Sequence, residues 1–404
     1  MSETKGSLET RQGEATQKLS LPALVLNFLR IGAIGFGGGM AVIALMERDL
    51  IDKRKAMSSE EFLHGVGMAQ VLGPFAPNTA LFMGNRLYGL FGGLACALAF
   101  LAPSVFLVIL LSWLYFSFHA IPALKNAVGG LGPVVIALIL SAAWSMGRKA
   151  VRSWPTVLLG VASLAISLVK VNAVYVLVAA GLAGLLLGGK RLGGRKNESD
   201  KGAKTEEKAT GSVSAFVPGL TLFPAVGGAT ASLSLPAIAS TFLKVGCVFF
   251  GGGFVLVPIL QQKLVTLLGW LTPTQFIDGV AISNLTPGPI AVLATFTGYH
   301  LHGVSGALVA TLCLFAPAFV LMTVLSHEYA RFKGRRHFED FLAGVTPAVV
   351  GLVISAAVLL APGTLRSPAD WGLMVVSLLL LTRFKWHPAW VLGIGALLGT
   401  VGLV

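Results

Sequence analysis

Two stretches of the chain, 214 residues apart, carry almost the same sequence around a glycine triplet. Residues 28–39 read FLRIGAIGFGGG, and residues 242–253 read FLKVGCVFFGGG. Seven of these twelve positions are identical and four more are conservative. The same offset aligns later positions, among them Phe62 with Phe276 and Pro103 with Pro317. The chain is therefore an internal duplication, and a functional site is expected where the two copies meet.

The composition places this duplication in a membrane. Of the 404 residues, 55% are hydrophobic and 12% are charged, whereas a soluble domain carries about 25% charged residues. Long apolar runs such as residues 92–114 have the length and character of membrane helices. The expected fold is all-α, a polytopic integral membrane protein with roughly 10–13 membrane segments.

Glycine and proline interrupt the apolar segments at matching places in the two copies. The breaks are Gly37–Gly39 and Gly73–Pro74 in the first copy, and Gly251–Gly253 and Pro287–Pro289 in the second. Inside a helix, glycine costs about 1 kcal/mol and proline about 3 kcal/mol relative to alanine. Each interrupted segment is therefore expected to be a broken helix or a re-entrant hairpin, whose free backbone groups need protein or water partners.

Polar segments divide the chain into four parts. Residues 1–19 are predicted to form a disordered tail, residues 20–188 the first repeat, residues 189–211 a charged cytoplasmic linker and residues 212–404 the second repeat. The linker carries seven basic and four acidic residues, a composition typical of a flexible and solvated segment.

Equivalent polar loops of the two copies differ in their number of Lys and Arg residues. The copy with the larger number alternates from one pair of loops to the next. Loop 47–61 contains four Lys or Arg residues and its copy 261–275 contains one. Over four such pairs, one alternating set of loops carries thirteen Lys and Arg residues and the other carries four. Positive loops face the cytoplasm, so the repeats are predicted to be inverted relative to each other. The basic set consists of loops 47–61, 148–153, 328–340 and 383–387.

An inverted repeat with helix breaks is typical of secondary transporters, whose sites lie near the membrane midplane at discontinuous helices. The sequence contains no Walker A motif, no dinucleotide fingerprint and no His cluster with metal-ligand spacing, so neither an enzyme nor a bound cofactor or metal is expected. The net charge of +13 is spread over loops and the linker. That distribution argues against a nucleic-acid partner, which would need a basic face.

Arg30 and Lys244 are the strongest single candidates for a substrate site. Both lie inside apolar segments, seven residues before a glycine triplet, and an intramembrane cation is a functional hypothesis by default. Two such cations suit a divalent oxyanion, to which arginine offers a bidentate contact. The alternative is that both side chains snorkel to the membrane interface.

The helix breaks are candidates for substrate contact through the backbone. N–H groups at the start of a half-helix, together with the helix dipole, bind anions, and amide side chains beside a break can also donate. The alternatives are that the glycines permit close helix packing and that the amides cap helix ends. The candidate residues are Gly37, Gly38, Gly39, Gly73, Pro74, Asn78, Gly251, Gly252, Gly253, Asn284, Pro287, Gly288 and Pro289.

Glu47, His64 and Asp278 are weaker candidates, for a coupling proton. Glu47 aligns with Gln261 and His64 aligns with Asp278, so the two copies differ at both positions. Histidine titrates near neutral pH, as a proton carrier would require. The sequence favours the plainer interpretation that these residues lie at solvated helix ends.

The paired glycine triplets, with a Gly-Pro break in the first copy and Thr286-Pro-Gly-Pro289 in the second, resemble the chromate transporter family in its long, two-domain form. The resemblance covers residues 21–404. It implies a multi-pass protein of the bacterial inner membrane that exports chromate with a membrane gradient and confers chromate resistance. The first copy departs from the family pattern at Val71–Pro74, where the leading proline is missing.

The residues alone predict an inverted-repeat transporter for an anion, and only the resemblance supplies chromate. The alternative is a transporter of sulfate or another anion with the same architecture. A membrane-embedded enzyme or an assembly scaffold would need a polar cluster near one face, and the sequence shows none. The expected partners are the oxyanion and the lipid bilayer, and a homodimer is left open.

Overall fold

The computed structural model describes residues 19–35, 39–118, 122–150, 153–169, 171, 173–187, 234–249, 253–332 and 336–402. The first repeat contains helices α1 Leu21–Ile34, α2 Gly39–Met46, η2 Glu47–Asp52, α3 Ser59–Val71, α4 Phe75–Phe118, α5 Pro122–Ala150, α6 Trp154–Leu168 and α7 Ala173–Leu187. The second contains α9 Leu235–Val248, η3 Gly253–Val255, α10 Leu256–Leu260, η4 Gln261–Leu267, α11 Pro273–Leu285, η5 Ile290–Val292, α12 Leu293–Phe332, α13 Arg336–Thr364, α14 Pro368–Thr382 and α15 Pro388–Thr400. These described parts contain no strand. Residues 1–18 of the predicted tail and the whole predicted linker lie outside them.

The internal duplication is confirmed by the helix boundaries. Helices α9, α11, α13 and α14 begin and end 214 residues after α1, α3, α5 and α6. The long helices α4 and α12 also kink at matching positions, where Gly89 and Gly303 adopt φ values of 68° and 59°. Glycine tolerates this left-handed backbone, so the same residue type bends both helices at the same place.

Helix α3 and the start of α4 form a helical hairpin, so the predicted break in this segment lies between Val71 and Phe75. Glu61 and Arg86, at the open end of the hairpin, form an ion pair with an Oε1–Nη2 distance of 2.6 Å. Gly65 faces the ring of Phe82 further along. In the second repeat Gly279 faces Phe296, so α11 and the start of α12 form an equivalent hairpin.

The hairpin tips depend on glycine. Gly73 and Gly288 have φ values of 105° and 120°, a region that side chains with a Cβ atom rarely adopt. Both tips therefore use a glycine in this conformation, although the proline before Gly288 has no counterpart before Gly73.

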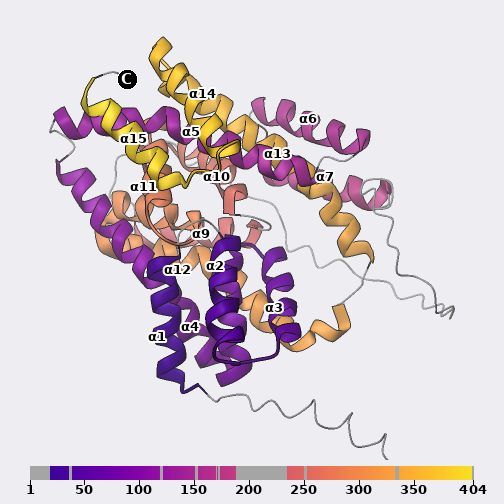
Figure 1. The fold of residues 1–404 in the computed structure, drawn as a ribbon. Helices are drawn as coiled ribbons and strands as arrows, with labels where there is room; N and C mark the ends of the chain where they lie inside the picture. The colour runs from indigo at the N-terminus through magenta and orange to yellow at the C-terminus, as the bar shows by residue number, and fades with distance from the viewer. Residues whose placement is uncertain are drawn as a thin grey trace, which may run out of the picture.

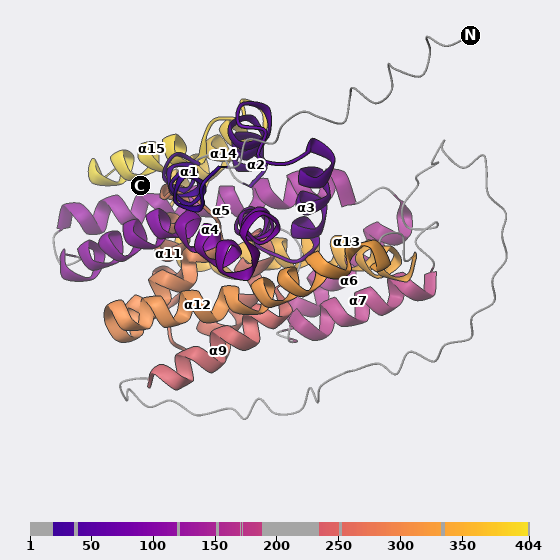
Figure 2. The same cartoon turned by 90° about the horizontal axis from the view of Figure 1, so that it is seen from below.

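The helices form two bundles (Figure 1). The hairpin bundle contains α1–α4 and α9–α12, in which α1 packs on α4, α9 on α12, and α4 on α12. Figure 2 shows α9 lying alongside α12. The peripheral bundle contains α5–α7 and α13–α15.

The repeats exchange helices inside the peripheral bundle. Helices α6 and α7 of the first repeat pack on α13 of the second, and α14 and α15 of the second pack on α5 of the first. Glycines allow these helices to touch backbone to backbone. Gly130 faces the carbonyl of Gly395, and Gly344, its equivalent, faces the carbonyl of Ala180.

The fold is that of an all-α polytopic membrane protein. In the described parts, four helices are long and apolar enough to cross a membrane, namely Phe75–Ser117, Gly129–Arg148, Ile290–Val324 and Ala343–Thr364. Seven shorter apolar helices of 10–17 residues accompany them. Large apolar side chains such as Phe91 and Leu186 are exposed on the outside, where lipid would cover them.

Candidate functional site

A cavity of about 820 Å³ lies between the hairpin bundle and the peripheral bundle. Sites for small molecules typically measure about 300–1,000 Å³, so the cavity has room for one small oxyanion together with several water molecules. Both repeats contribute to its walls, together with parts of α5, α14 and α15. The lining residues from the hairpin bundle include Gly35, Gly39, Pro74 and Phe75 of the first repeat and Phe249, Gly253, Ser283, Asn284, Gly288 and Pro289 of the second.

Helix ends surround this cavity. Helices α2 and α4 begin at Gly39 and Phe75, and in the second repeat short 3₁₀ turns beginning at Gly253 and Ile290 lead into α10 and α12. The first N–H groups of a helix have no partner inside it, and the dipole makes that end positive. Four chain segments thus direct their N-terminal ends to one cavity.

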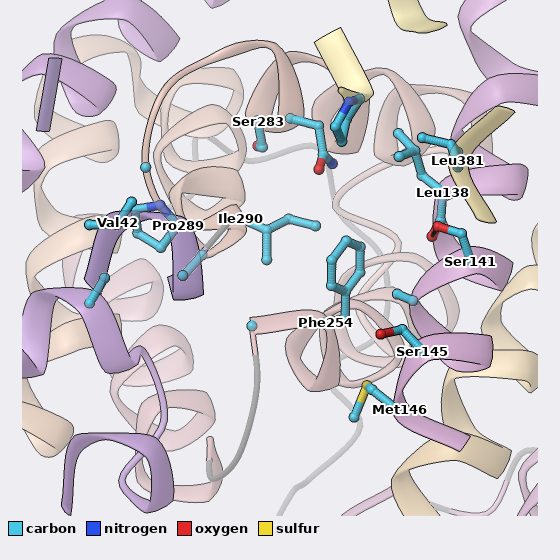
Figure 3. A pocket seen from close by; sticks show the side chains of 18 of the residues that line it. Val42, Leu138, Ser141, Ser145, Met146, Phe254, Ser283, Pro289, Ile290 and Leu381 are labelled. Atoms are coloured by element: carbon cyan, nitrogen blue, oxygen red, sulfur yellow. Dashed lines mark hydrogen bonds between the residues drawn. The ribbon is translucent and has the colours of Figure 1, made fainter. Parts of the chain in front are cut away.

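Polar side chains enter the cavity from opposite walls. Figure 3 shows Ser141 and Ser145 on the α5 wall and Ser283 across from them. The hydroxyl of Ser141 donates to the carbonyl of Leu138 at 2.8 Å. The amide of Asn284 donates to the carbonyl of Val280, also at 2.8 Å. That amide has a second N–H available, because a side-chain amide carries two.

The charged side chains among the described lining residues are basic, and none is acidic. Arg148 at the end of α5 and Lys385 before α15 are both exposed and line the cavity, and His387 lies beside them. Lys385 has a φ of 54°, a conformation that costs a residue with a Cβ of order 1–3 kcal/mol and tends to occur at functional sites.

Arg148 and Lys385 belong to two loops of the predicted cytoplasmic set, although 237 positions separate them. Both loops reach one cavity, so they lie on one side of the molecule, as the predicted inversion requires. The loop charges predict on which side of the membrane these cations lie, but no motif marks them as site residues. The signal that could have identified them is the excess of Lys and Arg in loops 148–153 and 383–387.

Six of the predicted site residues line the cavity: Gly39, Pro74, Gly253, Asn284, Gly288 and Pro289. Three others lie behind the lining. Gly73 contacts the carbonyl of Phe249, and the carbonyl of Pro287 accepts a hydrogen bond from Ser104. Asn78 is fully buried and donates to the carbonyl of Leu72 at 3.3 Å. Gly37, Gly38, Gly251 and Gly252 lie outside the described residues.

The structure does not bring Arg30 and Lys244 to the cavity. Both side chains are exposed, because the buried stripe of α1 runs through Leu24, Phe28 and Ile31 and the equivalent stripe of α9 excludes Lys244.

Arg30 lies near the polar turn η2. The pKa of the Asp49 carboxyl there is below its usual value because Lys53 donates a hydrogen bond to it and the charges of Lys53, Arg48 and Arg30 add to the effect. Arg30 is therefore electrostatically linked to the surface of the hairpin bundle.

Neither Glu47 nor Asp278 lines the cavity. Glu47 is half-buried at the start of η2, and the side chain of His64 lies outside the described part of the structure. Asp278 is buried in α11, where its Oδ2 accepts a hydrogen bond of 2.6 Å from the hydroxyl of Tyr115 in α4. Asp278 therefore lies inside the protein rather than at a solvated helix end, and its bond joins the two repeats.

Comparison with known proteins follows the same division into repeats. The sequence profile of a family described as chromate transporter matches residues 22–185 and 236–400. A probable chromate transport protein of Synechococcus elongatus is 32% identical over 363 residues, which cover 89% of each chain. The chromate transport protein of Cupriavidus metallidurans is 31% identical, over 91% of this chain and 89% of its own. That of Pseudomonas aeruginosa is 33% identical, over 86% of this chain and 82% of its own.

No solved structure matches the chain. The two family matches nonetheless extend over the two sets of helices that surround the cavity, α1–α7 and α9–α15. With the profile matching both repeats, the chain belongs to the chromate transporter family.

Proposed function

We propose that this protein exports chromate from the cytoplasm across a bacterial inner membrane and thereby confers chromate resistance. The observation that carries the proposal is the cavity between the bundles, where helix N-termini and basic side chains converge and no described lining residue is acidic. Such a site favours an anion. The basic loops at its mouth are the ones predicted to face the cytoplasm, so the cavity would receive the anion from that side, as export requires.

Each part of the cavity has a role in this proposal. Arg148 and Lys385 raise the local concentration of a divalent anion at the mouth. Deeper in the cavity, Ser145 and Asn284 replace part of its hydration shell, and the Ser141 hydroxyl joins them when it turns away from the carbonyl of Leu138. The N–H groups at the start of α2 and α4 oppose the charge of the anion. All of these groups come from one chain, so the proposed site does not require a homodimer.

The test is chromate uptake into inverted membrane vesicles, with an imposed pH gradient and with that gradient collapsed. Export from the cell corresponds to uptake into these vesicles, and the chromate inside should be recovered chemically unchanged, as expected for a transporter that is not an enzyme. Uptake equal to that of vesicles without the protein under both conditions would refute the proposal. Excess sulfate in a parallel assay measures selectivity, and undiminished uptake indicates a site specific for chromate.

Asp278 is the proposed coupling residue. Its carboxylate is buried in α11 and bonded to Tyr115 across the repeats, and a buried ionisable group in a membrane protein is a candidate proton carrier. Asp278→Asn should keep chromate uptake driven by a chromate gradient but lose its dependence on the pH gradient. Tyr115→Phe is the control, since it removes the bond and keeps the carboxylate. If Asp278→Asn retains full pH-gradient dependence, Asp278 is not the carrier.

A further inference from the structure

The hairpin bundle touches the peripheral bundle mainly through the second repeat. Helix α10 packs on α13 and α7, and α11 packs on α5, α13 and α15. Their first-repeat equivalents, α2 and α3, make no comparable contact with the peripheral helices in the parts of the chain that the structure describes. The contacts of α10 with α13 and α7 close the two bundles against each other at one place, and the 820 Å³ cavity lies at another, between α11, α5 and α15.

A glutamine joins the bundles on the closed side. The side chain of Gln262 in η4 accepts a hydrogen bond of 2.7 Å from the N–H of Ala173 and donates one of 2.7 Å to the carbonyl of Val171. These two bonds attach the hairpin bundle to the start of α7. We call them the Gln262 clamp.

A very small cavity lies beside the clamp. It has a volume of about 10 Å³, close to the minimum of roughly 10–15 Å³ that one water molecule needs. Gln261, which is buried, contributes to it. Its lining is Ser167, Pro258, Gln261, Gln262, Thr266, Ser355 and Leu359.

The repeat relates this narrow cavity to the wide one. Moving back 214 positions takes Ser355 to Ser141 and Leu359 to Ser145, and both of these serines line the wide cavity. The position equivalent to Gln262 in the first repeat is Arg48. The position equivalent to Val171 in the second repeat is Lys385, which lies at the open mouth of the wide cavity. Equivalent positions are thus closed on one side of the molecule and open on the other.

We propose that the Gln262 clamp is the closed outer gate of an inward-open state, and that transport requires it to open while η2, carrying Arg48, closes on loop 383–387. Inverted repeats provide two such arrangements of nearly equal contacts, because each repeat can adopt the conformation of the other. The proposal rests on the proposed function for the identity of the cargo, and on the predicted cytoplasmic side of the basic loops for which gate is the outer one.

Thiol labelling tests the gate without any transported ion. Ser145→Cys and Leu359→Cys are placed separately in a background in which Cys96, Cys247 and Cys313 are alanine, and an impermeant maleimide is added from either side. Ser145→Cys should react from the cytoplasmic side and Leu359→Cys only slowly from outside. Adding Gln262→Ala should speed the outside reaction of Leu359→Cys about fivefold or more and slow that of Ser145→Cys, because the population shifts.

Asn126→Ala is the control, since it removes an exposed amide on the same predicted side as the clamp. It should leave both labelling rates unchanged. Rapid labelling of Ser145→Cys from outside, or no effect of Gln262→Ala on either rate, would overturn the gate.

Cross-linking then tests whether the gate must move. A short, reducible bifunctional thiol reagent joins Val171→Cys to Gln262→Cys across the bundles. The matched control joins Ser167→Cys to Ser355→Cys, whose native hydroxyl oxygens are 2.7 Å apart but which both belong to the peripheral bundle. Only the first cross-link should abolish chromate uptake, and a reductant should restore it.

Full uptake with Val171→Cys and Gln262→Cys joined contradicts the gate. If chromate proves not to be the cargo, uptake is absent in every variant while the labelling rates still respond to Gln262→Ala. The failure of the substrate assignment is then distinguishable from the failure of the gate.

Discussion

The two repeats share their helix boundaries almost residue for residue, yet they meet the peripheral bundle in different ways. In the second repeat α10 and α11 pack on it, whereas in the first repeat α2 and α3 make no comparable contact with it in the described parts of the chain. Local sequence therefore builds the same elements twice, and the asymmetry lies in how those elements are docked. The free energies of the two docked arrangements need differ by only a few kcal/mol for both to be used.

The two sides also differ chemically. The closed side uses a neutral glutamine against main-chain groups, whereas the equivalent residues on the open side are Arg48 and Lys385. Closing the open side would bring these like charges toward each other, at a cost that a bound divalent anion would offset. The comparison suggests that the anion itself favours closure behind it.

The largest expected effect concerns the peripheral bundle, where the two repeats make equivalent glycine contacts. In Gly344→Val the new Cβ would overlap the carbonyl of Ala180, and in Gly130→Val it would overlap that of Gly395. Overpacking costs about 1–3 kcal/mol and more against a backbone atom, so both variants should lose most of their monodisperse protein in detergent. Gly393→Val, which meets no atom within 4 Å, should behave as wild type. Unequal losses for Gly344→Val and Gly130→Val would show that the peripheral bundle is itself asymmetric.

A smaller effect is expected at the basic mouth. Arg148→Glu with Lys385→Glu reverses two charges at the open side and should raise the KM for chromate about tenfold at low ionic strength, with a smaller change in high salt. Initial uptake rates in inverted vesicles measure it. Arg366→Glu, a cation outside the cavity lining, should leave KM unchanged. An equal rise in KM for Arg366→Glu would mean that the overall charge of the protein, rather than the charge at the cavity mouth, causes the effect.

A matched pair of serines sharpens the comparison further. Ser141→Ala with Ser145→Ala removes two hydroxyl groups from the open cavity and should raise KM about three- to tenfold, since a hydrogen bond to a charged group contributes about 1.5–3 kcal/mol at most sites and less where water remains. Ser355→Ala, at the position equivalent to Ser141, removes the bond to Ser167 and should leave KM unchanged. A rise in KM for Ser355→Ala alone would place the substrate on the closed side.

The smallest effect is expected for the cations singled out by the sequence. Arg30→Gln with Lys244→Gln should reduce uptake by no more than about twofold, because both side chains are exposed outside the cavity and surface charge pairs contribute little. The same vesicle assay applies. Loss of transport in this double variant would place both cations on the substrate pathway.

Backbone breaks were more predictable from the sequence than the positions of side chains. The breaks at Gly73 and Gly288 were predictable because their cause, the intrinsic preference of glycine, is local. The face on which Arg30 lies follows from which stripe of α1 packs, and only the spacing of Leu24, Phe28 and Ile31 indicates it. That Arg148 and Lys385 line the same cavity depends on how α5 packs with α14 and α15, which no local pattern encodes.

The exchange of helices between the repeats has a consequence for the biosynthesis of the protein. Helices α6 and α7 are synthesised long before α13, on which they pack. Helix α5 is likewise synthesised long before its partners α14 and α15. The first repeat therefore enters the bilayer with glycine-lined helix faces that have no partner. Synthesis must be nearly complete before either half of the peripheral bundle closes, so a chain that stalls before α13 should be a substrate for membrane proteolysis rather than a functional half-transporter.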